Sequence, residues 1–440
     1  MAQNSRLTKS QQVKLADART ITAIGKLGEG GQGTVYRVQI DGTKEERALK
    51  WYFIEEVNEP RDFYAHLQNN IDNGSPSVAF VWPEALTEWV KGTFGYVMPI
   101  IPSGYYEFTK YVMAKVRFES LDAIVNAALN LVSAFKALHL KGYNYQDLNY
   151  KNFVVAPRTG DVLLLDNDNV RGHGQWSGVQ GYKRFMAPEV VRGEKMPDTH
   201  TDRHSLALNL FYILIGDHPL EGSKTNVPCF TDKHDIKFFG TEPLFMFDKY
   251  DSANAPRAGQ DKNAIALWPC FPSYMHKAFQ KSFGQDSLLH SQGRLLEQEW
   301  LPLLVRLKSS IVRCPNCSAK MFLESKGTTI CLGCNQRVEP LGYLKFAKKR
   351  SNINVSLPIF DGVRLFEYYM DVNSEDFQTI AAAISVEEGK FLLRNNSTHN
   401  WTVTAPDGRT KTKQRGDDAV LRLGFKIDFG NGNVAEIIPN

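Results

Sequence analysis

Apolar positions alternate near both ends of the chain and follow a helical period in the middle. Alternation predicts strands from Ile21 to Lys26, from Thr34 to Ile40 and from Arg47 to Trp51. Apolar residues spaced i, i+3, i+4 and i+7 predict an amphipathic helix from Leu121 to Leu138. A second helix, opened by Asp202, is apolar nearly all round and must therefore be buried. The pattern indicates a strand-rich first part, a helical second part and further strands near the C-terminus.

A short apolar hairpin between the two helices has polar residues at its ends. Phe153-Val154-Val155 and the run from Val162 to Leu165 predict its strands. Asp147 and Asn152 precede the first strand, and Asp166 follows the second. We therefore expect three oxygen ligands near one point. This suits a Mg²⁺-bound nucleotide, because Mg²⁺ takes few carboxylates together with phosphate oxygens.

Glycines occupy the turn between the first two strands, in the order Leu27-Gly28-Glu29-Gly30-Gly31-Gln32-Gly33-Thr34-Val35. A dinucleotide-binding fold would need a helix directly after these glycines, whereas here a strand follows. Glycines let a backbone approach phosphate oxygens closely, although a plain glycine-rich hairpin is the alternative. On the third strand, Lys50 can reach phosphates as a point charge, whereas a lone strand lysine is more often a solvated surface residue.

Composition excludes several classes of protein. Hydrophobic residues make up 42% and charged residues 23% of the 440 residues, as in ordinary globular proteins of about three domains. The formal net charge of +4 is small, so we expect neither nucleic-acid nor membrane binding. No apolar run reaches the length of about 18 residues that would suggest a membrane span. Residues 1–19 are polar and are predicted to form a loose basic tail without a signal peptide.

Four of the six cysteines form two C-x-x-C pairs, Cys314 with Cys317 and Cys331 with Cys334. This spacing matches a four-thiolate zinc site within residues 311–340, and four protein ligands leave no open position, so Zn²⁺ would be structural. A redox pair is the alternative, but it would not need a second copy. Such cysteine usage favours a reducing compartment, so we expect a cytoplasmic protein.

In chain order, several elements resemble the signatures of protein kinases: the glycine hairpin, Lys50, the Asp147 loop, Asp166, Ala187-Pro188-Glu189, the Asp202 helix and Arg294. The resemblance covers residues 20–308 and implies an α+β, two-lobed protein kinase fold that uses ATP, Mg²⁺ and protein substrates. It implies that Lys50 holds the α- and β-phosphates and that Asp147 orients and deprotonates the acceptor hydroxyl. Asn152 and Asp166 would bind Mg²⁺, and Glu189 would pair with Arg294.

The resemblance also assigns the residues that would surround the nucleotide. Gly28, Gly30 and Gly33 would cover the phosphates, and Met98 would lie behind the adenine. The remaining residues of the implied nucleotide site are Leu27, Gly31 and Val35.

The sequence departs from the kinase pattern at several positions. A short helix from Pro60 to Ile71 should carry a glutamate that pairs with Lys50, but Ala65 stands where such a residue is plausible, and the partner stays unassigned. Gln146 replaces the usual arginine before Asp147, so we expect no docking of an activating phosphate there. Ser177 and Tyr182 are the nearest hydroxyls for that role.

These departures resemble the divergent bacterial Hanks-type Ser/Thr kinases of tellurite-resistance-associated phosphorylation triads. That resemblance implies a cognate phosphatase and a von Willebrand-type protein as partners. Two alternatives remain open. One is a pseudokinase scaffold that binds nucleotide, and the other is a small-molecule phosphotransferase of kinase-like fold.

The basic residues Lys345, Lys348, Lys349 and Arg350 are predicted to form a solvated linker, with nucleic-acid contact as the alternative. From Ile353 alternation predicts strands, and we expect a small β-sandwich over residues 345–440. Its later half, from Phe391 to Phe429, resembles a forkhead-associated domain. Phosphothreonine recognition in that family implies an arginine and a serine on adjoining loops. The corresponding loops are predicted near Leu365 to Glu367 and Ile380 to Ala383, where no cation occurs, although Arg364 borders the first. We therefore expect no phosphothreonine recognition in the usual manner.

Overall fold

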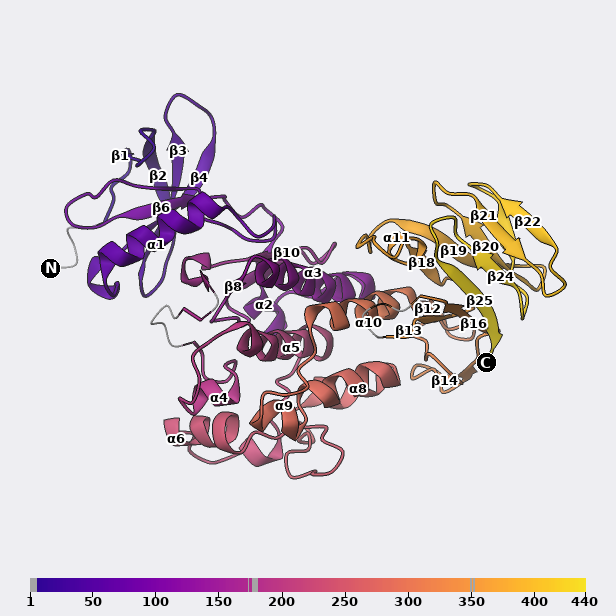
Figure 1. Cartoon of the computed structure of the whole chain (residues 1–440). Helices are drawn as coiled ribbons and strands as arrows, with labels where there is room; N and C mark the ends of the chain where they lie inside the picture. Colours follow the sequence, from indigo (N-terminus) through magenta and orange to yellow (C-terminus); the bar gives the residue numbers. More distant parts are fainter. Residues whose placement is uncertain (1–5, 173, 176–180, 349, 351–352) are drawn as a thin grey trace.

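The computed structural model describes residues 6–172, 174–175, 181–348, 350 and 353–440. They form two lobes, a small ribbon that carries the paired cysteines, and a β-sandwich. Figure 1 shows the N-terminal lobe at the upper left, the helical lobe in the centre and the sandwich at the right, with the ribbon strands between the last two.

The N-terminal lobe is an antiparallel sheet of strand order β1-β2-β3-β4-β6-β5, accompanied by one helix. Its elements are β1 (Gln12–Lys14), β2 (Thr20–Glu29), β3 (Gly33–Ile40), β4 (Glu46–Tyr52), α1 (Pro60–Asn73), β5 (Ala85–Leu86) and β6 (Gly95–Met98). Successive residues of β4 face opposite sides of the sheet. Leu49 and Trp51 join the apolar cluster on one side, whereas Tyr52 joins the cluster that includes Leu67 of α1. This alternation directs Lys50 to the same side as Tyr52.

The prediction of a loose basic tail over residues 1–19 is wrong for the described residues 6–19. Strand β1 pairs with β2 in antiparallel register, with Val13 opposite Ile21. Leu7, Val13 and Leu15 are buried against the sheet. Burial of these three apolar side chains stabilises the packing of the segment on the sheet, although most of its residues are polar.

The C-terminal lobe is mainly helical. Its helices are α2 (Phe108–Val112), α3 (Leu121–Leu140), α4 (Pro188–Val191), α5 (Thr199–Ile215), α6 (Asp232–Ile236), α7 (Lys262–Leu267), α8 (Ser273–Ser282), α9 (Gln285–Leu289) and α10 (Glu297–Ser309). Its short strands are β7 (Tyr106–Glu107), β8 (Tyr143–Asn144), β9 (Phe153–Val155), β10 (Val162–Leu164) and β11 (Arg171–Gly172). The predicted hairpin is the antiparallel pair β9–β10, and its ends carry the polar loops on either side.

Helices α3 and α5 form the centre of this lobe. Helix α5 begins earlier than Asp202, because the Asp198 side chain accepts hydrogen bonds from the backbone amides of His200 and Thr201. Among the described helices, α3 is the one long and apolar enough to cross a membrane by length and composition, yet it packs against α5 and α10 inside the lobe. A buried core helix meets the same criterion, so its apolar character is explained by packing.

The ribbon and the sandwich follow α10. The ribbon strands are β12 (Ile311–Arg313), β13 (Lys320–Phe322), β14 (Thr329–Ile330) and β15 (Arg337–Val338). The sandwich has a sheet of order β17-β16-β25-β24-β21-β22 and a second sheet of order β18-β19-β20-β23. Its elements are β16 (Gly342–Phe346), β17 (Ser356–Pro358), β18 (Arg364–Phe366), α11 (Glu367–Met370), β19 (Ile380–Glu387), β20 (Lys390–Asn395), β21 (Trp401–Thr404), β22 (Thr410–Lys413), β23 (Asp418–Val420), β24 (Lys426–Asp428) and β25 (Val434–Pro439).

The two stretches predicted as recognition loops are mostly strand. Leu365 and Ala382 lie opposite each other in the β18–β19 pair, and both are buried. The prediction of their loop structure was therefore wrong, because it was transferred from a partial resemblance that begins only at Phe391.

One apolar core runs from the C-terminal lobe through the ribbon into the sandwich. It includes Trp300 of α10, Phe322 of the ribbon, and Leu344 and Trp401 of the sandwich. The N-terminal lobe has two separate clusters. The sandwich is thus part of the same packed body as the helical lobe.

Candidate active site

Lys50, on strand β4 of the N-terminal sheet, contacts two acidic residues of the C-terminal lobe. It lies on β4 between Val35 of β3 and Tyr96 of β6, and 8% of its surface is exposed. Its Nζ lies 2.6 Å from Oδ2 of Asp168 and 3.4 Å from Oδ1 of Asp166. Burial by itself would lower the pKa of Lys50, but the neighbouring carboxylates of Asp168 and Asp166 together favour the charged form, and this pKa is raised well above its usual value.

The expected acidic partner of Lys50 is not on α1. The sequence of α1 contains Asp62 and Asp72 and no glutamate, and both acids are exposed. Ala65, the position considered for the partner, is also exposed. The partner is instead Asp168, which sequence reasoning did not assign. The signal was the second acid of Asp166-Asn167-Asp168, a polar run that follows the apolar strand β10.

Asp147 lies in a loop whose backbone is hydrogen-bonded to helix α5. Asp202 of α5 accepts hydrogen bonds from the backbone amides of Tyr145, at 2.6 Å, and Gln146, at 3.1 Å. Gln146 adopts a positive φ of 71°, a conformation that costs a non-glycine residue energy unless its surroundings hold it. The Gln146 amide donates to Asn144 Oδ1 and to the carbonyl of Gln175, which are neutral groups.

The Asp147 carboxylate is ringed by donors. The Asn149 amide lies 3.0 Å from Oδ1, the Asn152 amide lies 3.1 Å from Oδ2, and the backbone amide of Tyr182 donates to Oδ1 at 3.2 Å. Burial raises the pKa of Asp147, and these hydrogen bonds oppose the rise only in part. Ser177, one of the two candidate activation hydroxyls, lies outside the described residues, whereas Tyr182 contacts this carboxylate through its backbone.

Asp166 begins the next polar segment. Its φ of 49° is left-handed, which Asp tolerates better than most residues, and its side chain is 54% exposed. The following Asn167 is buried and donates to the carbonyls of Val81 and Leu164, both at 2.9 Å. These bonds secure the turn while leaving the Asp166 carboxylate accessible. One exposed carboxylate fits Mg²⁺, which takes few protein ligands together with phosphate oxygens.

The glycine hairpin joins β2 to β3 with a hydrogen bond of 2.9 Å from the Gly30 amide to the Gly33 carbonyl. A Cβ added at Gly28, Gly30 or Gly31 would meet no atom within 4 Å, so open space adjoins these positions. At Gly33 a Cβ would lie 2.3 Å from the Trp51 carbonyl oxygen, so this glycine is required for packing on β4. Of the remaining residues of the implied nucleotide site, Leu27 is 46% exposed, Val35 is half-buried, and Met98, at the end of β6, is half-buried.

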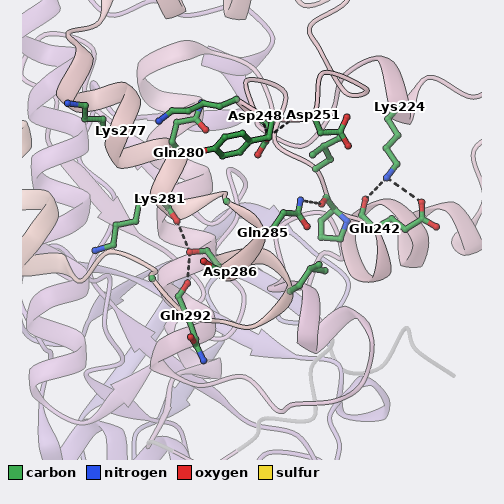
Figure 2. Close-up of a pocket in the computed structure, with 18 of the residues that line it drawn as sticks. Lys224, Glu242, Asp248, Asp251, Lys277, Gln280, Lys281, Gln285, Asp286 and Gln292 are labelled. Carbon is green, nitrogen blue, oxygen red and sulfur yellow. Dashed lines mark hydrogen bonds and ion pairs between the residues drawn. The ribbon is translucent and has the colours of Figure 1, made fainter.

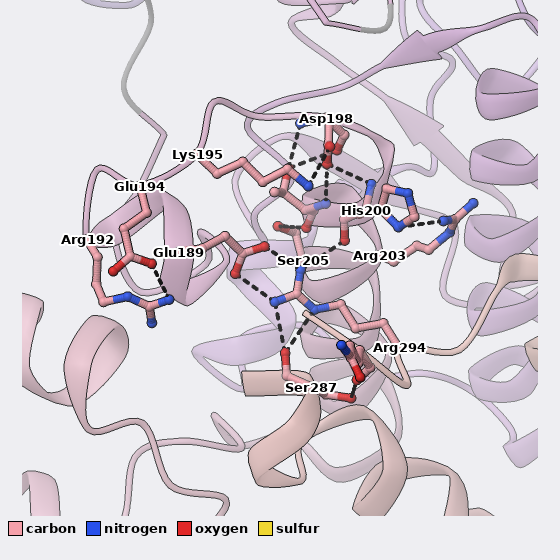
Figure 3. A network of polar contacts seen from close by, with 12 residues as sticks. Glu189, Arg192, Glu194, Lys195, Asp198, His200, Arg203, Ser205, Ser287 and Arg294 are labelled. Atoms are coloured by element: carbon pink, nitrogen blue, oxygen red, sulfur yellow. Dashed lines mark hydrogen bonds and ion pairs between the residues drawn. The ribbon is translucent and has the colours of Figure 1, made fainter. Parts of the chain in front are cut away.

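The predicted pairing of Glu189 with Arg294 is confirmed. Figure 3 shows the guanidinium of Arg294 facing the carboxylate of Glu189, with two contacts of 2.8 Å. Arg294 also donates to the carbonyl of Ser287. Burial alone would raise the pKa of Glu189, but Arg294 lowers it to about 2. The pair joins α4 to the loop between α9 and α10, and so fixes the helix that directly follows the segment containing Tyr182.

The four paired cysteines come together in the ribbon. Their sulfur atoms all lie within 4.8 Å of one another, with 3.7 Å between Cys314 and Cys334 and 3.6 Å between Cys317 and Cys331. Four sulfurs at about 2.3 Å from a central Zn²⁺ would be separated by roughly 3.8 Å, so the donor set fits a tetrahedral zinc site.

A large cavity lies away from these residues. It has a volume of about 860 Å³ and is formed around α8 and α9 and the loop at residues 241–251. Figure 2 shows that both lysines and acids line it, among them Lys224, which contacts Glu242, and Asp248, Lys277 and Asp286. This mixture of charges has no single ligand preference, and the cavity contains none of the predicted site residues.

Comparison with known families agrees with this geometry. The family model described as "Protein kinase domain" matches residues 21–257, which is more than half of the chain. The match includes the glycine hairpin, Lys50, Asp147, Asn152 and Asp166, and ends before the four paired cysteines and the sandwich. No curated protein matches the chain.

Proposed function

The chain belongs to the protein kinase family, and from this premise we propose that it transfers the γ-phosphate of ATP to Ser or Thr hydroxyls of protein substrates. One observation carries the proposal. Nζ of Lys50 lies 3.4 Å from Oδ1 of Asp166, although the two residues are 116 positions apart in the sequence. Asp166 follows the β9–β10 hairpin, and Asp147 lies in the loop that precedes it. This arrangement gathers a phosphate-binding cation, a metal-binding carboxylate and a base in the order that phosphoryl transfer requires.

The residues take the following roles in this proposal. Lys50 binds the α- and β-phosphates, and Asn152 and Asp166 hold Mg²⁺, which neutralises the phosphate charge when bound. Asp147 orients the acceptor hydroxyl and takes its proton. Burial raises the pKa of Asp147, which makes its carboxylate a stronger base than an exposed aspartate.

The nucleotide is held from above by the glycine hairpin. Gly28, Gly30 and Gly33 cover the phosphates, and Leu27, Gly31, Val35 and Met98 complete the site around the rest of the nucleotide. The open space beside Gly28, Gly30 and Gly31 supports this placement, because phosphate oxygens need close approach to backbone amides.

A second candidate is a pseudokinase scaffold that binds nucleotide and partners without efficient transfer. The Asp147 carboxylate favours it, because this carboxylate already accepts hydrogen bonds from Asn149, Asn152 and the backbone of Tyr182. An acceptor hydroxyl would have to displace or share one of these donors.

Incubation with labelled ATP and Mg²⁺, with mass spectrometry of the phosphorylated residues, separates these candidates. The wild type should phosphorylate itself or a general protein substrate on Ser or Thr. Asp147→Ala should lose about 10²- to 10⁴-fold in rate, because a general base contributes that range. Nucleotide binding without turnover in the wild type would favour the scaffold, and full activity of Asp166→Ala would contradict the assignment of the metal ligand.

Around this kinase body we propose a structural Zn²⁺ held by Cys314, Cys317, Cys331 and Cys334, and a sandwich of forkhead-associated type. Three departures from the kinase pattern support a place among bacterial kinases of tellurite-resistance-associated triads: Gln146 before Asp147, Asn149 where a lysine is common, and Asn167 in place of the usual phenylalanine after Asp166. Its partners would then include a cognate phosphatase and a von Willebrand-type protein, in the cytoplasm. Co-purification of the chain with candidate partners from a bacterial triad would test this assignment.

A further inference from the structure

We propose that Asp168 is the positioning residue that holds Lys50 for phosphate binding, in the role that a helix glutamate has in the kinase pattern. The inference rests on the proposed function, because it concerns how Lys50 is aimed at ATP. It goes beyond that function by moving the acid of the ion pair from a helix to the segment that carries the metal ligand.

The Asp168 carboxylate accepts hydrogen bonds from two side chains of β4. Its Oδ2 lies 2.6 Å from Lys50 Nζ and 2.5 Å from the Tyr52 hydroxyl. Asp168 is fully buried, so its charge has no access to water and depends on these partners. Lys50 and Tyr52 lie on the same side of one strand, so β4 presents both donors together.

Asp168 and the proposed metal ligand Asp166 belong to one short turn. The 3-10 turn Asn167–Asn169 follows Asp166 directly, and Asn167 fastens it to the carbonyls of Val81 and Leu164. The carbonyl of Asp168 accepts a hydrogen bond of 2.9 Å from Arg171. Because Asp166 and Asp168 belong to one short turn, a movement of this turn would shift the Lys50 contact and the metal ligand together.

The side chains of α1 that contact Tyr52 and the segment after Asp168 include Phe63 and Asn70, which carry no charge. The Phe63 ring packs edge-on against Tyr52 at 5.3 Å, and the Asn70 amide donates to the carbonyl of Val170 at 3.2 Å. Asp62 and Asp72 face solvent. The ion pair of Lys50 therefore does not require an acid on α1. Instead, the conformation of the turn from Asp166 to Asn169 determines the position of the Lys50 ammonium group.

The test measures ATP affinity and turnover for the full chain. The variants are Asp168→Asn, Tyr52→Phe, Lys50→Met and the double variant Lys50→Met with Asp168→Asn. Asp62→Asn, which removes the exposed acid of α1, is the matched control. Affinity for ATP is measured without metal as well as with Mg²⁺, since the contact of Lys50 with phosphate needs no metal. Tyr52→Phe removes one hydroxyl and keeps the fold testable if Asp168→Asn does not fold.

Asp168→Asn should weaken metal-free ATP binding about tenfold or more and raise KM for ATP, and Tyr52→Phe should do the same by a few-fold. The double variant should be no weaker than Lys50→Met alone, because residues that act through one another are not additive. Asp62→Asn should behave as the wild type.

Three results would overturn the proposal. Additive losses in the double variant would show that Asp168 acts independently of Lys50. A loss seen only with Mg²⁺ would make Asp168 a metal ligand, and normal ATP binding in both Asp168→Asn and Tyr52→Phe would make the contact irrelevant. Failure of the proposed function reads differently, because the wild type itself would then show no phosphate transfer.

Discussion

At the residue scale, glycines of one hairpin serve different purposes. Gly33 is fixed by packing, because a Cβ there would lie 2.3 Å from the carbonyl oxygen of Trp51. Gly31 faces open space. The same substitution at these two positions therefore separates stability from nucleotide binding.

Gly33→Ala should lower the free energy of unfolding by about 1–3 kcal/mol, because overpacking against a backbone atom forces the strands apart. Gly31→Ala is the control and should change stability by no more than about 0.5 kcal/mol while raising KM for ATP. Urea unfolding and steady-state kinetics measure the two effects. Equal stability of the two variants would contradict this assignment.

The buried ion pair of Glu189 and Arg294 makes a second prediction at this scale. Arg294→Leu should cost about 3–5 kcal/mol, because it leaves a buried carboxylate without its cation. Glu189→Leu together with Arg294→Leu should cost less than the sum of the single changes. A double-mutant cycle by urea unfolding measures this coupling, and strictly additive costs would show that the pair is not coupled.

At the element scale, His139 ties three helices together. It lies on α3, with Nε2 3.1 Å from Asp202 of α5 and Nδ1 2.9 Å from Glu297 of α10. Arg203 also contacts Glu297 at 3.0 Å. Burial would lower the pKa of His139, but the two carboxylates raise it to about 9. The protonated imidazole thus links Asp202, which binds the backbone of the Asp147 loop, to α10, which leads into the ribbon.

This contact should make stability fall as pH rises. The folded-state pKa of about 9 exceeds the ordinary 6.5, so the stabilisation is complete below pH 6.5 and is lost as pH rises through 9. The change corresponds to about 3 kcal/mol. Urea unfolding of the wild type and His139→Gln at several pH values tests this, because the variant lacks the titrating group. The same pH dependence in both proteins would assign it to other residues.

The ribbon is the second element with a specific test. Metal analysis should find one Zn²⁺ per chain, and a chelator should unfold residues 311–340, because binding energy at such sites is folding energy. Cys317→Ser should lose the metal, whereas Cys229→Ser, at an exposed cysteine outside the cluster, should retain it. Absence of zinc, or an oxidised Cys314–Cys317 pair in the native protein, would contradict the assignment.

At the scale of the whole molecule, the sandwich is fastened to the helical lobe by both apolar and polar contacts. Lys308 of α10 donates to the carbonyl of Phe377 at 2.7 Å, and its Nζ lies 4.4 Å from the centre of the Phe366 ring. Arg364 pairs with Asp122 of α3 at 2.5 Å. The continuous core and these contacts indicate that the sandwich acts as a fixed part of the helical lobe, whereas the N-terminal lobe has its own clusters.

The sandwich should therefore bind phosphothreonine and threonine peptides equally weakly in the full chain. Arg364, the cation nearest the predicted recognition loop, is paired with Asp122, and Arg394 is paired with Asp418 at 2.8 Å. Fluorescence anisotropy with matched peptides measures the difference, with Arg394→Ala as a control. Tight binding that requires the phosphate would contradict the prediction, and its survival in Arg394→Ala would place the recognition site elsewhere.

Local pattern alone determined much of this protein. The glycine hairpin, the β9–β10 hairpin with its polar ends, α3 and the two C-x-x-C turns all follow from spacing within about twenty residues. Such features depend on backbone dihedral preferences and on which side chains a turn or helix face brings together, and neighbours in sequence decide both. The ordered set of these features also indicated the kinase fold.

Tertiary structure decided the pairings between distant segments. Asp168 rather than a residue of α1 holds Lys50, residues 6–19 join the first sheet through β1, and Arg364 faces Asp122 across 242 positions. Each choice depends on where two separately formed elements pack, and the energy of a buried charge is set by whatever surrounds it there. The sequence pattern identifies the charged and apolar residues, but only the packing of the elements determines which of them are in contact.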